Sequence, residues 1–222
     1  MKLADLKGRI PEKIYERLDI ENLRPAQEKA VNSGLLEKDN LLVCTPTASG
    51  KTLIAELAAC SSIMGGRGKT IYITPLKALA TEKFREFSKK YDGLFNIALA
   101  IGDLDSPDYY LANYDLIICT SEKLDSLIRH HSPWLNNVAV LVIDEIHLLN
   151  DAGRGPTLEV LITILRQLKK DMQIIGLSAT IGNEKELASW LGAKLVHDTW
   201  RPVELHKGTY FSGLEFENKN LK

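Results

Sequence analysis

The sequence lacks a long apolar run, has few cysteines and carries almost no net charge. Its longest strongly apolar stretch, Val138 to Ile143, is far too short to span a bilayer, and the first residues contain no apolar core of a secretory signal. The formal net charge of -1 excludes a basic field over the whole protein, so any nucleic-acid contact must be local. We therefore expect an intracellular, cytoplasmic protein with no membrane partner.

The cysteines are few and far apart. Their odd number and wide spacing fit neither a zinc site nor a disulfide framework. Because their neighbours are apolar, we expect buried free thiols without a disulfide partner, in a reducing compartment. They are Cys44, Cys60 and Cys119.

Short apolar runs alternate with segments of helical period over most of the chain. The runs are nearly unbroken, which is typical of strands buried on both faces of a parallel sheet. Apolar residues recur at three- and four-residue spacing over 76–87 and 158–168, which predicts amphipathic helices. The sequence therefore predicts an α/β fold, an open parallel sheet with helices on both faces. The expected strands are Leu41–Cys44, Thr70–Thr74, Ile97–Ile101, Leu116–Thr120, Val138–Ile143 and Gln173–Ser178.

The ends of the chain differ from its centre. Residues 1–35 are predicted to be helical, and the α/β domain is predicted over 36–200. Residues 201–222 are expected to contribute one strand at Val203–Tyr210, followed by a polar tail without a pattern. No internal repeat or low-complexity tract is present.

The segment TPTASGKT follows a predicted strand and opens a helical pattern. This context is typical of a phosphate-binding loop, in which backbone N–H groups and a helix N-terminus face the phosphates. Lys51 then reaches the β/γ oxygens and Thr52 the Mg²⁺. The generic motif has glycine where Thr45 stands. Gly50 is the second glycine of the motif, which lets the backbone approach the phosphates closely. The candidate nucleotide-binding residues are Thr45, Pro46, Thr47, Ala48, Ser49, Gly50, Lys51 and Thr52.

Two further polar segments end predicted strands, and both are therefore expected at the same edge of the sheet as the loop. Asp144 and Glu145 follow the strand Val138–Ile143; Asp144 would hold Mg²⁺ and Glu145 would polarise the attacking water. Ser178–Ala179–Thr180 end the strand Gln173–Ser178. Each segment by itself is also compatible with an ordinary helix start.

Five motifs in order carry a family resemblance: TPTASGKT, PLKALA, TSEKLDSLIR, DEIH and SAT. Together they resemble the first motor domain of superfamily 2 DExH-box helicases. The leading threonine of the loop is similar to the Ski-like branch. TSEKLDSLIR with Trp134, RGPTLE and WRPVELHKG are most similar to archaeal HelQ-type DNA helicases. The resemblance implies a RecA-like, P-loop NTPase domain over 36–200, with a glutamine motif in 1–35.

The resemblance also implies roles for single residues. Gln27 resembles the adenine-reading glutamine, and Lys51 and Glu145 resemble the catalytic pair. His147 and Ser178, Ala179 and Thr180 resemble the relay between the ATP site and the nucleic acid. Without the resemblance, Gln27 would be a solvated helix residue and Thr120 with Ser121 a helix cap. The segments matching nucleic-acid backbone contacts contain Leu76, Lys77, Ala78, Gly102, Asp103, Thr120, Ser121 and Lys123.

The predicted function is that of an ATP-binding motor domain of a DNA helicase, with ATP and Mg²⁺ as cofactors. The resemblance implies 3′–5′ movement on single-stranded or forked DNA in replication and repair. It also implies a second RecA-like motor domain of the same parent chain as partner. Because the sequence stops at Lys222 without a second phosphate site, we expect weak ATP binding and very slow hydrolysis by this chain alone.

Three alternatives remain open. An RNA helicase of the Ski-like branch uses the same backbone contacts. A self-contained P-loop ATPase or kinase needs its own transition-state cation, for which Arg154 and Arg129 are the only candidates. A silent scaffold has no chemical need for Glu145. Trp134 and Trp200 are interpreted as packing anchors, and Tyr109 with Tyr110 as a weak candidate for base stacking.

Overall fold

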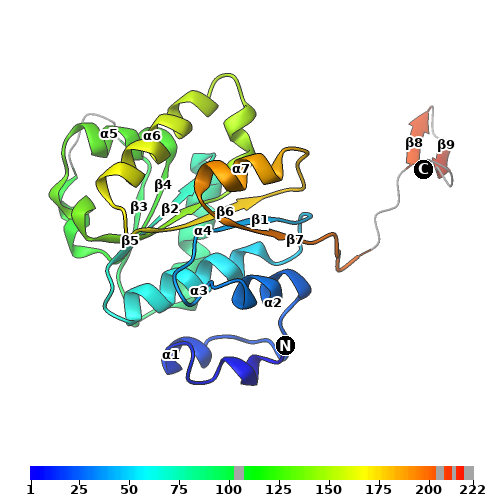
Figure 1. Ribbon diagram of the computed structural model, residues 1–222, viewed down its shortest axis with the longest axis horizontal. Coiled ribbons are helices and arrows are strands. Elements are labelled where there is room, and N and C mark those ends of the chain that lie inside the picture. Colours follow the sequence, from blue (N-terminus) through cyan, green and yellow to red (C-terminus); the bar gives the residue numbers. More distant parts are fainter. Residues whose placement is uncertain (103–107, 204–207, 212–213, 218–222) are drawn as a thin grey trace.

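The computed structural model describes residues 1–102, 108–203, 208–211 and 214–217. Its centre is a seven-stranded sheet in the order β3-β4-β2-β5-β6-β1-β7, in which every neighbouring pair is parallel (Figure 1). The predicted parallel sheet is therefore confirmed. The strands are β1 Leu41–Cys44, β2 Lys69–Thr74, β3 Ile97–Ala100, β4 Leu116–Thr120, β5 Val138–Ile143, β6 Gln173–Ser178 and β7 Lys194–His197.

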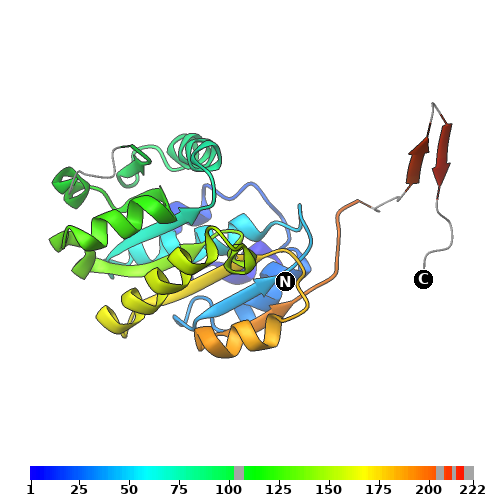
Figure 2. The same ribbon diagram turned by 90° about the horizontal axis from the view of Figure 1, so that it is seen from above.

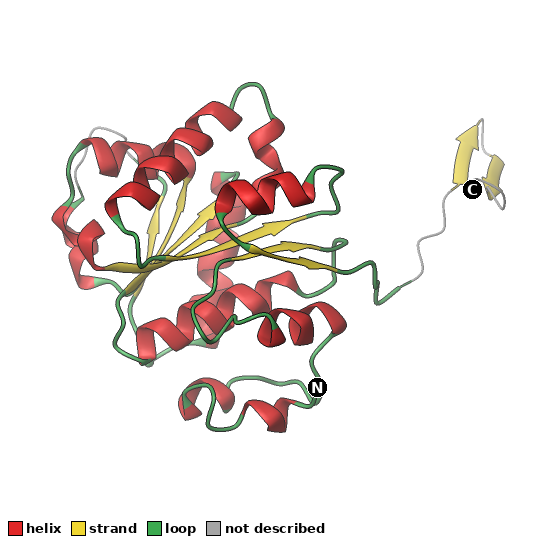
Figure 3. Ribbon diagram, in the orientation of Figure 1, coloured by secondary structure: helices red, strands yellow, loops and turns green. Residues whose placement is uncertain are grey.

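Helices cover both faces of this sheet, as Figures 2 and 3 show. Successive strand residues point to opposite faces, so Val43 packs in one apolar cluster with α3 and α4, and Leu42 packs in another with α5, α6 and α7. This explains the unbroken hydrophobic runs of the strands. The α-helices are α1 Glu12–Tyr15, α2 Pro25–Asn32, α3 Lys51–Met64, α4 Lys77–Lys90, α5 Ser121–Arg129, α6 Gly155–Leu168 and α7 Glu184–Leu191. The 3-10 helices are η1 Leu3–Leu6, η2 Tyr109–Asn113, η3 Pro133–Asn137 and η4 Ile146–Asn150.

Two strand predictions need correction. The edge strand β7 was not predicted, because its sequence KLVH has a single buried residue, Val196, and takes its place through pairing with β1. The late strand was expected at Val203–Tyr210, whereas the structure has β8 at Gly208–Phe211, paired antiparallel with β9 at Leu214–Glu217. The tail is thus not without structure, since β9 lies within it. Val203 belongs to no strand, and residues 204–207 lie outside the described residues.

The first 35 residues are less helical than predicted, because helix is confined to η1, α1 and α2. Leu6 and Ile14 are nevertheless fully buried, in the apolar cluster that also contains α3 and β1. The part that contains α1 lies beneath α2 and α3 in Figure 1. Its leucines and isoleucines therefore extend the core on the α3 side of the sheet.

All three cysteines are buried, as predicted. Burial raises the pKa of the Cys44 thiol to about 11 and those of Cys60 and Cys119 to about 12. Within the described part of the chain, no helix has the length and apolar character needed to cross a membrane.

Candidate nucleotide-binding site

Three polar segments meet at the carboxyl edge of the sheet. β5, β6 and β1 are adjacent strands, and they are followed by Asp144–Glu145, Ala179–Thr180 and the loop that starts at Thr45. In a doubly wound parallel sheet, the crevice at this edge is the usual place for a ligand. The predicted convergence of these motifs is therefore present in the fold.

The loop between β1 and α3 has the conformation expected of a phosphate-binding loop. Ala48 and Gly50 have φ angles of 63° and 90°, and α3 begins directly after Gly50. Inside the loop, the hydroxyls of Thr45 and Ser49 lie 2.7 Å apart. A left-handed residue followed by a helix start directs successive N–H groups into one concavity, which suits an anion.

Lys51 links this loop to the turn after β6. Its Nζ donates to the carbonyl oxygen of Ser178 at 2.9 Å and to that of Thr45 at 3.3 Å. The Thr45 N–H donates to the same Ser178 oxygen at 3.2 Å. The Ser178 hydroxyl is buried and makes no hydrogen bond within the described residues. The loop and the Ser178 turn therefore form one connected unit.

Gln27 is buried rather than solvated, being only 4% exposed. Its Oε1 accepts from the Arg24 backbone N–H at 2.8 Å, and its Nε2 donates to the Gly50 carbonyl at 3.0 Å. Arg24 in turn donates from Nη1 to the Ala48 carbonyl at 2.7 Å. A cavity of about 470 Å³ opens beside these residues, lined also by Leu18, Ile20, Asn22 and Leu53.

Asp144 is held by two hydrogen bonds. The Tyr72 hydroxyl donates to Oδ2 and the Glu145 backbone N–H to Oδ1, each at 3.0 Å. Burial raises the pKa of the Asp144 carboxyl, and the charge of Glu145 adds to this; the Tyr72 hydrogen bond, Lys83 and Lys51 act in the opposite direction. Fixed orientation of a carboxylate near lysines is suited to a cation and phosphate site.

Glu145 has a left-handed backbone, with a φ of 53°, and begins η4. Its side chain is 31% exposed and Oε2 lies 3.2 Å from His147 Nδ1. That Nδ1 is buried and makes no hydrogen bond within the described residues, so the two groups are close without being aligned as donor and acceptor. Ala179 is half-buried and Thr180 exposed.

The residues at this edge fit a magnesium nucleotide. A Cβ at Gly50 would lie 2.5 Å from Gln27 Nε2, so only glycine keeps the Gln27 amide against the loop. The Thr52 hydroxyl and the Asp144 carboxylate are hard oxygen ligands, and Mg²⁺ typically takes one or two such ligands together with phosphates and waters. No group of three or more His, Cys, Asp or Glu side chains suited to a metal occurs in the described residues.

The nucleic-acid candidates divide into an exposed and a buried group. Leu76, Lys77 and Ala78 are exposed at the start of α4, with 45% exposure of Leu76, and Gly102 is exposed after β3. Thr120, Ser121 and Lys123 are buried. Asp103 lies outside the described residues.

The buried group has structural partners of its own. The Thr120 hydroxyl accepts from the Lys123 N–H at 3.4 Å and thereby caps α5. Lys123 Nζ lies 2.6 Å from Asp108 Oδ2, and its side chain is only 2% exposed. A phosphate contact from this ammonium would first require the ion pair to open. Lys123 is therefore not a surface lysine.

The remaining candidates lie away from the nucleotide loop or have other partners. Arg154 donates to the Pro75 carbonyl at 3.4 Å, and Arg129 forms a surface pair with Asp125. Trp134 is buried in the core, as predicted for a packing anchor. Trp200 is 38% exposed, and its ring lies 5.7 Å from the Arg24 guanidinium carbon.

Sequence reasoning missed three residues of the site: Arg24, Tyr72 and Lys83. Tyr72 is one aromatic in an apolar strand, and no pattern marks its hydroxyl as a partner of Asp144. Lys83 lies on α4, yet its Nζ donates to the Thr52 hydroxyl at 3.2 Å. Arg24 directly precedes the helix of Gln27, which is the only signal that could have pointed to it.

Comparison with known proteins adds a family match. The DEAD/DEAH box helicase family matches residues 24–187. The ATP-dependent DNA helicase Hel308 of Pyrococcus abyssi is 54% identical over 220 residues, which are 97% of this chain and 30% of that protein. Hel308 of Methanocaldococcus jannaschii is 53% identical over 218 residues, 94% of this chain and 18% of that protein.

Solved structures agree with this match. The crystal structure of the DUF1998 helicase MrfA bound to DNA superposes with a TM-score of 0.75 and 28% identity, covering 86% of this chain and 30% of that chain. A structure of the same helicase bound to DNA and AMPPNP also has a TM-score of 0.75. The chain thus spans 30% or less of the length of these relatives.

Proposed function

The chain belongs to the DEAD/DEAH box helicase family, and we propose that it is the ATP-binding motor domain of an ATP-dependent DNA helicase. The observation that carries the proposal is the meeting of the Thr45–Thr52 loop, Asp144–Glu145 and the Ser178 turn at one edge of the sheet, joined by the Lys51–Ser178 hydrogen bond. The relatives named DNA helicases support DNA as the substrate. We also propose that residues 36–200 form one RecA-like domain and that residues 1–35 contain the glutamine motif.

In this proposal, different residues of the chain bind the phosphates, bind the metal and accept a proton from water. The loop amides and Lys51 bind the phosphates, and Thr52 with Asp144 holds Mg²⁺, which supplies charge neutralisation on the phosphate oxygens when bound. Glu145 accepts a proton from the attacking water. Its carboxylate is 31% exposed and follows β5 directly after Asp144, which supports this role.

The base of the nucleotide is assigned to the cavity beside Gln27. Its lining combines the apolar side chains of Leu18, Ile20 and Leu53, which could pack on a ring, with polar side chains such as Asn22 and Gln27, which could bond to the ring's edge. Gln27 Nε2 donates a hydrogen bond to the Gly50 carbonyl. This bond would connect a base bound beside Gln27 to the phosphate loop. Ser178 accepts a hydrogen bond from Lys51, and His147 Nδ1 lies 3.2 Å from Glu145 Oε2; these contacts with the proposed ATP site support the proposed relay role of His147 and Ser178–Thr180.

The nucleic-acid strand is proposed to contact the exposed Leu76–Ala78 segment and Gly102. Helix starts and exposed N–H groups bind phosphate oxygens without reading sequence. Thr120, Ser121 and Lys123 contribute by shaping α5 rather than by direct contact, because they are buried. Single-stranded or forked DNA, 3′–5′ movement and a role in replication and repair follow from the family likeness.

A second motor domain of the parent protein is the proposed partner. An arginine supplied across such a domain interface is worth about 10³–10⁵ in rate for comparable phosphoryl transfers. In the described part of this chain neither Arg129 nor Arg154 is directed to the loop. The chain alone should therefore bind ATP weakly and hydrolyse it very slowly. The buried thiols support a reducing, cytoplasmic location.

Steady-state ATP turnover tests the proposal. The chain is assayed alone, with single-stranded DNA and with matched single-stranded RNA, beside an ATP-binding titration. Glu145→Gln is the control, since it removes the proposed base and keeps the side-chain shape. Binding with almost no turnover in all three conditions supports an incomplete motor site. Turnover that Glu145→Gln abolishes but nucleic acid does not change would identify a self-contained ATPase, and the helicase proposal would be wrong. DNA and RNA are then compared on a protein of the relatives' full length.

A further inference from the structure

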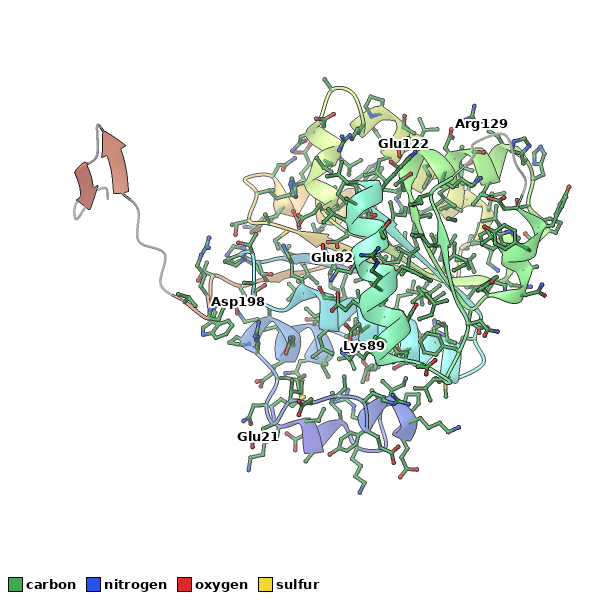
Figure 4. The ribbon with its side chains drawn as sticks, turned by 180° about the vertical axis from the view of Figure 1, so that it is seen from behind. Glu21, Glu82, Lys89, Glu122, Arg129 and Asp198 are labelled. Atoms are coloured by element: carbon green, nitrogen blue, oxygen red, sulfur yellow. The ribbon has the colours of Figure 1, made fainter. Side chains whose placement is uncertain are left out.

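Lys83 approaches the oxygen atoms that are assigned to the metal. It lies on α4, the helix in front of the sheet in Figure 4, where Glu82 and Lys89 are labelled. Its Nζ lies 3.2 Å from Thr52 Oγ1 and 2.8 Å from Glu86 Oε2. The side chain is only 18% exposed, and its Nζ lies 5.9 Å from the centroid of the Phe87 ring. Lys83 is thus a largely buried cation with two alternative oxygen partners.

A divalent cation and this ammonium would compete for the Thr52 hydroxyl oxygen, because both are positively charged. With Nζ at 3.2 Å from Oγ1 and a normal Mg–O distance, the metal would lie no more than about 5.3 Å from Nζ. At that separation two cations repel strongly in a partly buried site.

We propose that Lys83 competes with Mg²⁺ for the Thr52 hydroxyl and moves fully to Glu86 when a metal–nucleotide binds. Lys83 is then a positioning residue that sets the divalent-metal requirement of the site. The inference rests on the proposed function, because it takes Thr52 and Asp144 as the metal-binding residues. Glu86 is necessary to it, since at 2.8 Å it already provides the second partner.

Two variants should change the metal requirement in opposite directions. Lys83→Met removes the competing charge and keeps the packing on Phe87, so less Mg²⁺ should be needed. Glu86→Gln removes the alternative partner and leaves Lys83 on Thr52, so more Mg²⁺ should be needed. Lys89→Met is the matched control, because Lys89 is an exposed lysine on the same helix (Figure 4).

The assay is the binding of a fluorescent ATP analogue, first in EDTA and then across a Mg²⁺ titration, with circular dichroism as a check of folding. We expect Lys83→Met to lower the Mg²⁺ midpoint about two- to fivefold and to weaken binding in EDTA by a similar factor, because partly exposed charges give effects of this order. Glu86→Gln should raise the midpoint, and Lys89→Met should leave both values unchanged.

The outcomes separate this inference from the function on which it rests. If Lys83→Met weakens binding equally in EDTA and Mg²⁺, Lys83 is a general phosphate contact and the competition is wrong. An unchanged midpoint in both Lys83→Met and Glu86→Gln overturns it as well. If Lys83→Met does not fold, the shift in Glu86→Gln decides. If the unaltered chain binds no nucleotide in either buffer, the proposed function fails first, and this inference fails with it.

Discussion

Gly50→Ala tests whether the phosphate loop depends on close contact with Gln27. Gly50 has a φ of 90°, where an alanine costs about 1–2 kcal/mol. The new Cβ would also lie 2.5 Å from Gln27 Nε2 and 3.2 Å from Arg24, so the Gln27 hydrogen bond to the Gly50 carbonyl must break. That loss adds about 1 kcal/mol. We therefore expect the free energy of unfolding to fall by about 2–3 kcal/mol.

Gly66→Ala is the matched control. Gly66 also has a positive φ, of 67°, but no atom lies within 4 Å of a Cβ built there. The entropy lost by the unfolded chain is the same for both substitutions and cancels in the comparison. Gly66→Ala should therefore cost only the backbone term of about 1–2 kcal/mol, without the loss of a hydrogen bond.

Thermal unfolding and nucleotide binding measure the difference. For a domain of this size about 1 kcal/mol corresponds to about 2–4 °C, so Tm should fall by about 4–12 °C in Gly50→Ala and by about 2–4 °C less than that in Gly66→Ala. Nucleotide affinity should fall at least about tenfold in Gly50→Ala alone, since the loop and the base pocket are displaced together. Equal losses of Tm in the two variants, or normal nucleotide affinity in Gly50→Ala, would refute the reasoning.

Three further predictions concern stability and reactivity. Tyr91→Phe removes an O–H that donates to the buried Glu56 carboxylate at 2.7 Å, so urea unfolding should show a loss of about 1.5–3 kcal/mol; no loss would mean that Lys90 alone satisfies Glu56. Burial tends to raise the pKa of Asp198, but hydrogen bonding and charge from Lys29 outweigh it and hold that pKa below its usual value. The stability lost in Asp198→Asn should thus be full at neutral pH and vanish as pH falls through the lowered pKa of the folded state, and a loss independent of pH contradicts this. In the native protein, the buried thiols of Cys44, Cys60 and Cys119 should react very slowly with a disulfide reagent near pH 8, and they should react quickly after unfolding. Fast labelling of the native protein would disprove their burial.

The α/β fold could be read from the sequence because strands buried on both faces leave unbroken apolar runs. β1, β4, β5 and β6 have the bounds that these runs predicted. β7 could not be read, because a short edge strand with one buried residue has no hydrophobic pattern, and its strand conformation depends on pairing with β1. Helix in the first 35 residues was overestimated, because its apolar residues pack against α3 from irregular backbone as well as from helices.

The chemical groups of the proposed nucleotide site could be identified from sequence motifs alone. The loop motif, the acidic pair and the serine turn each end a buried strand, and parallel strands deliver their carboxyl ends to one edge whatever the details of packing. The order of these motifs was also sufficient to indicate the helicase family.

The exposure and the partners of the polar side chains depend on the tertiary structure. Lys77 and Lys123 look alike in sequence, yet one is exposed and the other is buried against Asp108. Gln27 was buried by its contact with Gly50, and Lys83 was brought to Thr52 by the packing of α4 beside α3. These contacts join residues that are 15 to 31 positions apart. Local pattern encodes where a strand ends, but the partner of a charged side chain depends on distant segments that only folding brings together.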